Sequence, residues 1–519
     1  MLLVLDGWGQ APPGPDNAIA AADTPFLDEL LENYPVLMLD ASGSAVGLPD
    51  GVAGNSEIGH LVIGAGRPLT YDSLLVQRQA ESGDLRANPQ LREVCTRLAE
   101  NGSALHLVGL CSDGRIHSDI AHFAELLHAA ADAGLGEVWL HPITDGRDVA
   151  DHTAGGYLAR LAELAESAGV GSYATVIGRN YAMDKSGNTK LTDAACRLLL
   201  DAEATATARD GITAVDTSTG DASLPPTVIS EGAFTGVRDG DAILFANFRS
   251  DRTAPLVDMV ADRLPASGRE NVRLLSLAQY DTRTTIPALV ARADASGGLA
   301  DALEAAEVRS VRIAEREKFE HVTFFVNGRD SRHRSVEEHQ CVASAVGDDY
   351  IARPEMNVDG VAQHVVDAMA RDEVALVIAN LANIDVVGHT GDYAATVRGT
   401  EAVDRAVRRI CQQARATGRW VLLVGDHGNG EQMSQRSDDG TSRPYGGHTH
   451  NKVPCVLMPA SQGEPVLAET GTPLRLPSVA PTVLDLLGVP KPTAMSEPSL
   501  LDVRETSRSQ TSASVAIKS

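Results

Sequence analysis

The chain has 519 residues, of which 43% are hydrophobic and 22% charged, and its formal net charge is −26. This composition is that of a globular protein and excludes disorder as a global description, while the length allows two or three domains. A general binder of nucleic acid or of an anionic membrane would need a basic face, so we expect neither as a partner. Any anionic substrate must be held by a local cluster of positive charge.

Short apolar runs alternate with amphipathic stretches along the chain, which predicts an α/β fold with mainly parallel sheets. Strands are expected at 2–5, 104–110, 138–140, 175–177, 242–246, 322–326, 375–378 and 420–424. Helices are expected at 120–133, 155–168 and 394–416. The last stretch, 504–519, is rich in Ser and Thr and is expected to form a disordered tail.

Two changes in composition indicate domain boundaries. Near 66–74 the chain leaves a glycine-rich helix, and near 291–297 its composition changes to small and polar residues. The residues with metal-ligand character lie only before residue 70 and after residue 300. We therefore expect one discontinuous domain, formed by 1–70 and 299–503, and a second domain formed by 71–298 and inserted into it.

The start of the chain and its cysteines indicate a cytoplasmic protein. Residues 1–6 lack a basic leader, and their apolar run ends at Asp6, which is too short for a signal peptide. No apolar run in the sequence approaches the ~20 residues of a membrane span. The six cysteines are scattered without a Cys-x-x-Cys pair, as is typical of free thiols in a reducing compartment.

Four segments carry carboxylates and imidazoles in patterns that suit metal ions. Their candidate ligands are Asp6, Asp385, His389, Asp426, His427 and His448. Asp6 and Asp426 follow predicted strands, whose carboxyl ends share one crevice in a doubly wound sheet. The i, i+4 spacing of Asp385 and His389 places both side chains on one helix face. Taken singly, Asp6 could cap a turn, and Asp385 and His389 could form a surface pair. Together, the mixed oxygen and nitrogen ligands favour two ions of Mn²⁺ or Zn²⁺.

Ser56 lies in the segment 54–60 (Gly-Asn-Ser-Glu-Ile-Gly-His), which is expected to enter a helix in whose first turn the serine lies. Ser56 or Asn55 could be an ordinary helix N-cap. The same geometry suits a nucleophile, because a helix N-terminus favours a phosphoryl group and a metal ion can activate the hydroxyl.

Basic residues recur in loops that follow predicted strands. They are His117, Arg147, Arg179, Lys185, Arg249, Arg252 and, later in the chain, Lys318. Each alone could be solvated surface charge, whereas their recurrence at strand ends favours binding of phosphate or carboxylate.

These motifs, in this order, resemble the cofactor-independent phosphoglycerate mutases of the alkaline phosphatase superfamily. The resemblance runs from residue 3 to about residue 501 and rests on segments 47–51, 54–60, 144–148, 177–184, 247–252, 321–325, 388–391 and 426–429. It implies an α/β fold in which a discontinuous alkaline-phosphatase-like metal domain, with a doubly wound sheet, contains an inserted α/β transferase domain. The implied reaction is the interconversion of 3- and 2-phosphoglycerate by a monomer, through phosphorylated Ser56 and without 2,3-bisphosphoglycerate.

The resemblance also implies a role for each matching residue. One ion would be held by Asp385, His389 and His448, and the other by Asp6, Ser56, Asp426 and His427. Mn²⁺ is the expected ion, with Zn²⁺ and Co²⁺ as alternatives. The phosphoglycerate would be held by His117, Arg147, Asp148, Arg179, Lys185, Arg249, Arg252 and Lys318. Of these, His117 or Asp148 would handle the protons of the substrate hydroxyls.

The sequence departs from the family pattern around Lys185. Lysine stands where the family usually has arginine, and 186–189 (Ser-Gly-Asn-Thr) replaces the Arg-Trp that normally follows. A lysine is a point charge and lacks the fork that binds a carboxylate with two hydrogen bonds. Three alternatives therefore stay open: a paralogue that transfers another phosphorus group, such as phosphonoformate, to phosphoglycerate; a metal-dependent phosphatase; and a non-catalytic binding protein.

Overall fold

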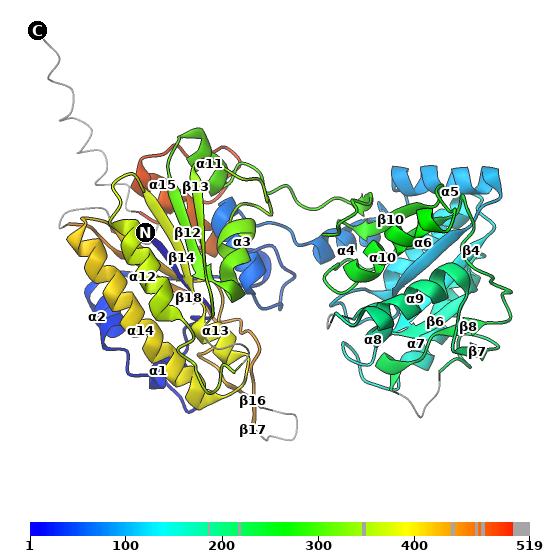
Figure 1. Ribbon diagram of the computed structural model, residues 1–519, viewed down its shortest axis with the longest axis horizontal. Coiled ribbons are helices and arrows are strands. Elements are labelled where there is room, and N and C mark those ends of the chain that lie inside the picture. Colours follow the sequence, from blue (N-terminus) through cyan, green and yellow to red (C-terminus); the bar gives the residue numbers. More distant parts are fainter. Residues whose placement is uncertain are drawn as a thin grey trace, which may run out of the picture. The chain divides into compact units, whose positions relative to one another are not determined.

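The chain folds into two units, one formed by Met1–Thr70 and Asp294–Ser519 and the other by Tyr71–Ala293. The computed structural model in Figure 1 describes residues 1–184, 187–215, 220–344, 349–436, 442–461, 466–468 and 473–501. The expected tail at 504–519 and the candidate Lys185 lie outside these ranges. The chain returns to the first unit at 293–294, whereas the sequence placed this boundary at 298–299.

A mixed sheet of order β13-β12-β14-β1-β15-β18-β2 forms the centre of the first unit. Its strands are β1 (Leu2–Leu5), β2 (Val36–Leu39), β12 (Ser310–Glu315), β13 (Glu337–Val342), β14 (Leu376–Leu381), β15 (Val421–Gly425) and β18 (Val453–Met458). The strands from β13 to β15 in this order are parallel, while β18 is antiparallel to both its neighbours. Every residue of β1, β14 and β15 is buried, as expected of parallel strands covered on both faces.

Helices cover both faces of this sheet. They are α1 (Ala18–Ala21), α2 (Pro25–Asn33), α3 (Ser56–Ala65), α11 (Leu299–Ala305), α12 (Val358–Met369), α13 (Asn383–Gly388), α14 (Tyr393–Ala416) and α15 (Val479–Leu487). α2, α12 and α14 share one hydrophobic core with the central strands. In Figure 1, α3 lies on the opposite side of the strands from α12 and α14. A small hairpin, β16 (Ser434–Arg436) and β17 (Ser442–Pro444), stands apart from the main sheet.

The second unit has a sheet of order β11-β10-β9-β3-β4-β6-β8-β7, with β5 paired to β4. Its strands are β3 (Leu105–Leu110), β4 (Val138–Thr144), β5 (Ser172–Tyr173), β6 (Thr175–Gly178), β7 (Ala206–Ala208), β8 (Thr227–Ile229), β9 (Ala242–Phe245), β10 (Arg273–Ala278) and β11 (Ala288–Val290). Its helices are α4 (Asp72–Ser82), α5 (Pro89–Asn101), α6 (Ile120–Asp132), α7 (Ala154–Ala168), α8 (Arg179–Ala182), α9 (Thr189–Asp201) and α10 (Ala254–Ala266). Among these strands, β8 runs antiparallel to β6.

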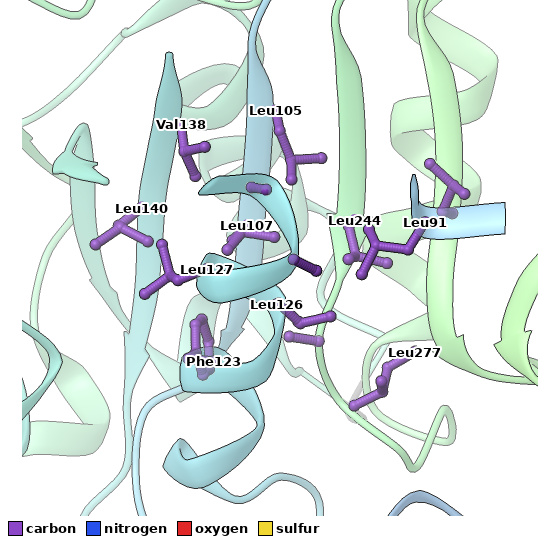
Figure 2. Close-up of a cluster of buried hydrophobic side chains, with 14 of the residues drawn as sticks. Leu91, Leu105, Leu107, Phe123, Leu126, Leu127, Val138, Leu140, Leu244 and Leu277 are labelled. Atoms are coloured by element: carbon purple, nitrogen blue, oxygen red, sulfur yellow. The ribbon is translucent and has the colours of Figure 1, made fainter. Parts of the chain in front are cut away.

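Two separate cores hold the second unit together, one on each face of its sheet. α4, α5, α6 and α7 contribute to the first core, and α9 and α10 to the second. Figure 2 shows the first core, in which Phe123, Leu126 and Leu127 of α6 lie over Leu107 and Leu140 of the sheet. The i, i+3, i+4 spacing of the three α6 residues puts them on one helix face, which explains why the sequence predicts this helix so well.

The prediction of a strand at 322–326 is wrong. The segment His321–Phe325 forms a π-helix, and the strand of this region is β12 at Ser310–Glu315. Val322, Thr323 and Val326 are buried while Phe324 and Phe325 are half-buried, which is a helical pattern and not an alternating one. This π-helical segment packs closely against α3 at Gly64. A Cβ at Gly64 would lie 1.9 Å from the carbonyl oxygen of Val326, so a glycine is needed there. A short apolar run does not by itself distinguish a buried strand from a buried helix.

The other expected strands and the three expected helices are present with small shifts at their ends. β4, for instance, continues to Thr144, beyond the expected 138–140. Within the described ranges, no helix combines the length and the apolar composition that a membrane crossing requires.

Candidate active site

The carboxyl ends of adjacent parallel strands bring four charged residues of the first unit together. Lys318 follows β12, Asp385 follows β14, Asp6 follows β1 and Asp426 follows β15. All four side chains are buried. Because parallel strands end at the same edge of a sheet, residues more than 400 positions apart share one crevice. Lys318, which the resemblance groups with the substrate residues, lies among the candidate metal ligands.

Ser56 is the first residue of α3 and points into this crevice. Its Oγ donates to Asp6 Oδ1 at 3.1 Å, accepts from Lys318 Nζ at 2.6 Å and lies 2.9 Å from His427 Nε2. The helix is capped by Asn55, whose side chain accepts from the backbone N–H of Ile58 at 3.0 Å. The serine hydroxyl is therefore not used as a cap, and it lies at the positive end of the helix dipole.

Asp385, His389 and His448 form the first candidate ion site. Asp385 Oδ1 is 3.2 Å from the Nε2 atoms of both histidines, which lie 3.1 Å from each other. His389 Nδ1 lies 2.7 Å from the Gly446 carbonyl, to which it donates, so its Nε2 carries a lone pair aimed at the other two groups. A cation at the meeting point of a carboxylate oxygen and imidazole nitrogens would satisfy all three.

Asp6, Asp426 and His427 provide the second candidate ion site, beside Ser56. His427 Nε2 lies 3.4 Å from Asp6 Oδ1 and 3.5 Å from Asp426 Oδ2. Asp426 Oδ1 accepts from the backbone N–H groups of Gly7 and His427, whereas its Oδ2 is buried without a hydrogen bond. A buried carboxylate oxygen without a hydrogen bond is costly, and only the imidazole nitrogens of His60 (3.3 Å) and His427 (3.5 Å) come within salt-bridge distance of it among the described residues, so this donor set fits a bound cation.

Negative charge is in excess in this centre, because the three carboxylates Asp6, Asp385 and Asp426 outnumber the two cations Lys318 and His427. Burial is the largest influence on Asp6 and raises its pKa, but the Lys318 ammonium and His427 together hold that pKa well below its usual range. Burial likewise opposes charge on Lys318, yet Asp385 and Asp6 raise its pKa. The pKa of His427 is raised for the same reason: burial lowers it, but the nearby carboxylates, Asp426 foremost, outweigh burial and raise it to about 10. Such a site binds cations strongly and releases protons when it does so.

Several residues that support this centre were missed from the sequence. Asn380 Nδ2 donates to Asp6 Oδ2 at 2.6 Å and lies 3.0 Å from His60 Nε2, and His60 Nδ1 lies 2.8 Å from the Ser56 carbonyl oxygen. Glu431 holds the loop that follows His427. A polar Asn inside the apolar strand β14, and a histidine four residues after Ser56 on α3, were available signals.

In the second unit, Arg179 binds two of the carboxylates that follow β4. Its NH1 lies 2.5 Å from Asp145 Oδ1 and 2.9 Å from Asp148 Oδ1. Asp145 Oδ1 also accepts from the backbone N–H groups of Arg147 and Asp148, which fixes the loop around it. Asp148 Oδ2 is buried without a hydrogen-bond partner.

A cavity of about 420 Å³ opens beside this pair, lined by Arg147, Arg179, Asn180, Met183, Asp184, Leu191 and Arg252. Three of the predicted substrate-binding arginines thus share one cavity. Among the described residues, neither Arg147 nor Arg252 has a carboxylate within salt-bridge distance, so their guanidinium groups are available to an anion.

His117 and Arg249 meet at a third carboxylate, Asp251. His117 Nδ1 lies 3.6 Å and Arg249 Nε 3.0 Å from Asp251 Oδ1. Burial lowers the pKa of His117 to about 4, against the opposing effect of Asp251. The imidazole is therefore neutral near pH 7 and can accept a proton.

Comparisons with known proteins extend along almost the whole chain. The Metalloenzyme superfamily matches residues 1–491. The 2,3-bisphosphoglycerate-independent phosphoglycerate mutase of Streptomyces coelicolor is 55% identical, covering 96% of this chain and 98% of its own. The enzyme of the same name from Halobacterium salinarum is 37% identical, covering 96% of this chain and 99% of its own.

A solved structure supports the same relationship. The phosphoglycerate mutase of Leishmania mexicana, determined at low cobalt concentration, has a TM-score of 0.75 and 28% sequence identity, covering 96% of this chain and 97% of that one. The α/β architecture inferred from the sequence is thereby confirmed. The chain belongs to the 2,3-bisphosphoglycerate-independent phosphoglycerate mutases of the metalloenzyme superfamily.

Proposed function

We propose that this chain interconverts 3-phosphoglycerate and 2-phosphoglycerate through a phosphoserine at Ser56, without 2,3-bisphosphoglycerate. The observation that carries the proposal is the setting of the Ser56 hydroxyl, at a helix N-terminus within 2.6 Å of Lys318 Nζ and 2.9 Å of His427 Nε2. The 55% identical Streptomyces coelicolor relative bears the name of this activity.

The residues of the first unit can form and hold a phosphoserine. Ser56 donates its proton toward Asp6 Oδ1, which leaves lone pairs on Oγ for attack on phosphorus. Lys318 donates to the same Oγ and stabilises the negative charge that develops there. The Oγ–P bond forms as the bond from phosphorus to the substrate oxygen breaks, and that oxygen takes up the proton that Ser56 has released. Transfer to the other hydroxyl of glycerate reverses these steps and regenerates Ser56.

We propose two divalent ions for the candidate sites. One is held by Asp385, His389 and His448, and the other by Asp6, Ser56, Asp426 and His427. When bound, they would favour the alkoxide form of the serine and neutralise the phosphoryl oxygens. Mixed oxygen and nitrogen ligands support Mn²⁺ as the first choice, with Zn²⁺ and Co²⁺ as alternatives.

The second unit supports a role in binding the glycerate part. Arg147 and Arg252 are available to the phosphate and carboxylate, while Arg179 is already paired with Asp145 and Asp148. His117, neutral near pH 7, and Asp148 would exchange protons with the glycerate hydroxyls. We assign Arg249 and Lys185 to the same task from the family resemblance, whereas Lys318, which the resemblance also groups with the substrate residues, would act on the phosphoryl group from its place beside Ser56. We further propose a cytoplasmic monomer in which 1–70 and 299–503 form the metal domain and 71–298 the inserted domain.

An enolase-coupled assay with added Mn²⁺ and no 2,3-bisphosphoglycerate tests the reaction. The wild-type protein should convert 3-phosphoglycerate, and Ser56→Ala should lose turnover while keeping its fold. Ser310→Ala is the matched control, because Ser310 is a buried serine of the first unit whose hydroxyl has no hydrogen-bond partner. Full activity of Ser56→Ala would refute the phosphoserine route.

The same assay separates the alternatives. Release of inorganic phosphate faster than isomerisation would favour a phosphatase. Turnover only when phosphonoformate is supplied with phosphoglycerate would favour the phosphonate-transferring paralogue, and no turnover together with no bound metal would favour a binding protein.

A further inference from the structure

We propose that Glu431 is a positioning residue that couples the two ion sites by fixing the spacing between the loops of His427 and His448. This inference rests on the proposed two-ion centre. It concerns a side chain that belongs to neither ligand set.

Glu431 contacts both loops with a single buried carboxylate, which is 2% exposed. Its Oε2 accepts from the backbone N–H of Asn429 at 2.8 Å. Its Oε1 accepts from Asn451 Nδ2 at 2.9 Å and from the hydroxyl of Thr449. All three partners are donors, so the carboxylate is the one acceptor that they share.

These partners stand next to the metal-type histidines. Asn429 is two residues after His427, and Thr449 directly follows His448. The loops also meet through the backbone, where Thr449 N–H donates to the Gly428 carbonyl at 3.0 Å. The rings of His427 and His448 have centroids 4.0 Å apart although they belong to different proposed ion sites. Fixing the two loops to one carboxylate therefore fixes the distance between the two sets of ligands.

Glycines leave no room for this carboxylate to move. A Cβ at Gly9 or at Gly428 would lie 2.3 Å from the Glu431 side chain. Both glycines are thus required by the close approach of the glutamate. A side chain enclosed in this way holds its partners more rigidly than an exposed one.

The charge of Glu431 also suits a role toward the ions. In the described part of the chain, no lysine, arginine or histidine forms a salt bridge with it, although it is almost fully buried. A buried carboxylate without a cation is unfavourable unless positive charge lies close by. The two divalent ions proposed for the adjoining loops supply that charge.

Mn²⁺ binding followed by electron paramagnetic resonance tests the proposal without measuring activity. The wild-type protein should bind two Mn²⁺ ions whose spins are coupled. In Glu431→Ala, we expect the Mn²⁺ dissociation constants to rise between about tenfold and a hundredfold, with weaker spin coupling. Glu431→Gln should be intermediate, because the amide keeps the volume and an acceptor for the Asn429 N–H but loses the charge.

Asp404→Asn is the matched control. Asp404 is another buried carboxylate of the first unit, which accepts from the backbone N–H groups of Phe26 and Leu27 and contacts neither histidine loop. We expect this variant to lose stability but to keep the affinity and the spin coupling of the wild type. Loss of coupling in this variant as well would show a general effect of stability and would overturn the proposal.

The outcomes distinguish the inference from the proposed function. Two coupled ions in both wild type and Glu431→Ala, with equal affinities, would refute the role of Glu431 alone. Fewer than two ions in the wild type would refute the two-ion centre itself. If Glu431→Ala does not fold, Thr449→Val carries the test, because it removes one donor with little change of shape. Unchanged coupling there would refute the proposal, and weaker coupling would support it.

Discussion

At the scale of single residues, the chemistry of the first unit depends on a lysine that lies among three carboxylates. Lys318 Nζ lies 2.8 Å from Asp6 Oδ1, 2.6 Å from Asp385 Oδ2 and 2.6 Å from Ser56 Oγ. The lysine thus neutralises part of the negative charge and touches the proposed nucleophile. Its charge and the charge of bound ions act on the same carboxylates.

Replacing this lysine should make the first unit more dependent on metal. Lys318→Met keeps most of the side-chain volume but leaves Asp6 and Asp385 without their cation, and breaking such buried pairs costs about 3–5 kcal/mol. We expect the metal-free variant to melt well below the metal-free wild type, with a smaller difference after Mn²⁺ is added. Thermal unfolding with and without Mn²⁺ measures both differences. Equal destabilisation in the two conditions would contradict this account.

Part of the candidate site could be predicted residue by residue. The i, i+4 spacing of Asp385 and His389, and the position of Ser56 in a first helical turn, are local patterns that the structure shows. The place of Lys318 could not be read in the same way, because it is 262 residues from Ser56 and reaches it only through the order of strands in the sheet. Glu431 was missed for a related reason, since two of its three partners, Thr449 and Asn451, belong to the loop of His448.

At the scale of elements, seven of the eight expected strands are present, and each of these was predicted from a short apolar run. β1 and β15 are examples: β1 is followed by Asp6 and β15 by Asp426, and both aspartates belong to the candidate site. The apolar run at 322–326 was wrongly predicted as a strand, because its packing partner, Gly64 of α3, is far away in the sequence. β12 was missed because Arg312 interrupts its apolar pattern, and that arginine is buried against Glu337.

Strands β3 and β4 carry a buried pair of histidines that should make the second unit sensitive to acid. His106 Nδ1 lies 3.1 Å from His141 Nε2, and His106 Nε2 lies 3.2 Å from Asp241 Oδ2. Burial lowers the pKa of both imidazoles, with that of His141 well below its ordinary value. The unfolded chain therefore takes up protons first, below about pH 6.5.

The stabilisation from these neutral histidines is complete above about pH 6.5 and is lost as the pH falls below it. The free energy of unfolding should decrease by up to about 1.4 kcal/mol per pH unit for each imidazole. Urea unfolding at several pH values measures this slope, followed by the fluorescence of Trp139 in a Trp8→Phe, Trp420→Phe background, because Trp8 and Trp420 belong to the first unit. His141→Gln should flatten it; an unchanged slope in that variant would contradict the assignment to this pair.

At the scale of the whole molecule, the two units divide the proposed work. Every metal ligand predicted from the sequence belongs to the first unit, and the described arginine cavity belongs to the second. Each unit has its own main sheet, and the hydrophobic cores on that sheet are formed by residues of the same unit. The acidic chain as a whole, with its net charge of −26, thus keeps a local set of arginines for an anionic substrate.

Removal of metal should therefore affect one unit and spare the other. Ions that bind only the folded first unit stabilise it by about 4 kcal/mol when their concentration is a thousand times the dissociation constant. Calorimetry should show two transitions, of which chelation lowers one. Equal shifts of both transitions on chelation would contradict the placement of all ligands in the first unit.

The central claim is that the phosphoryl group passes through Ser56 and returns to glycerate. Phosphorus NMR tests it most directly, on samples of Mn²⁺-loaded protein incubated with 3-phosphoglycerate alone and then quenched with a chelator. We predict a growing 2-phosphoglycerate signal with no inorganic phosphate, and no change for Ser56→Ala. A growing signal of inorganic phosphate without 2-phosphoglycerate, or isomerisation that survives in Ser56→Ala, would contradict the account.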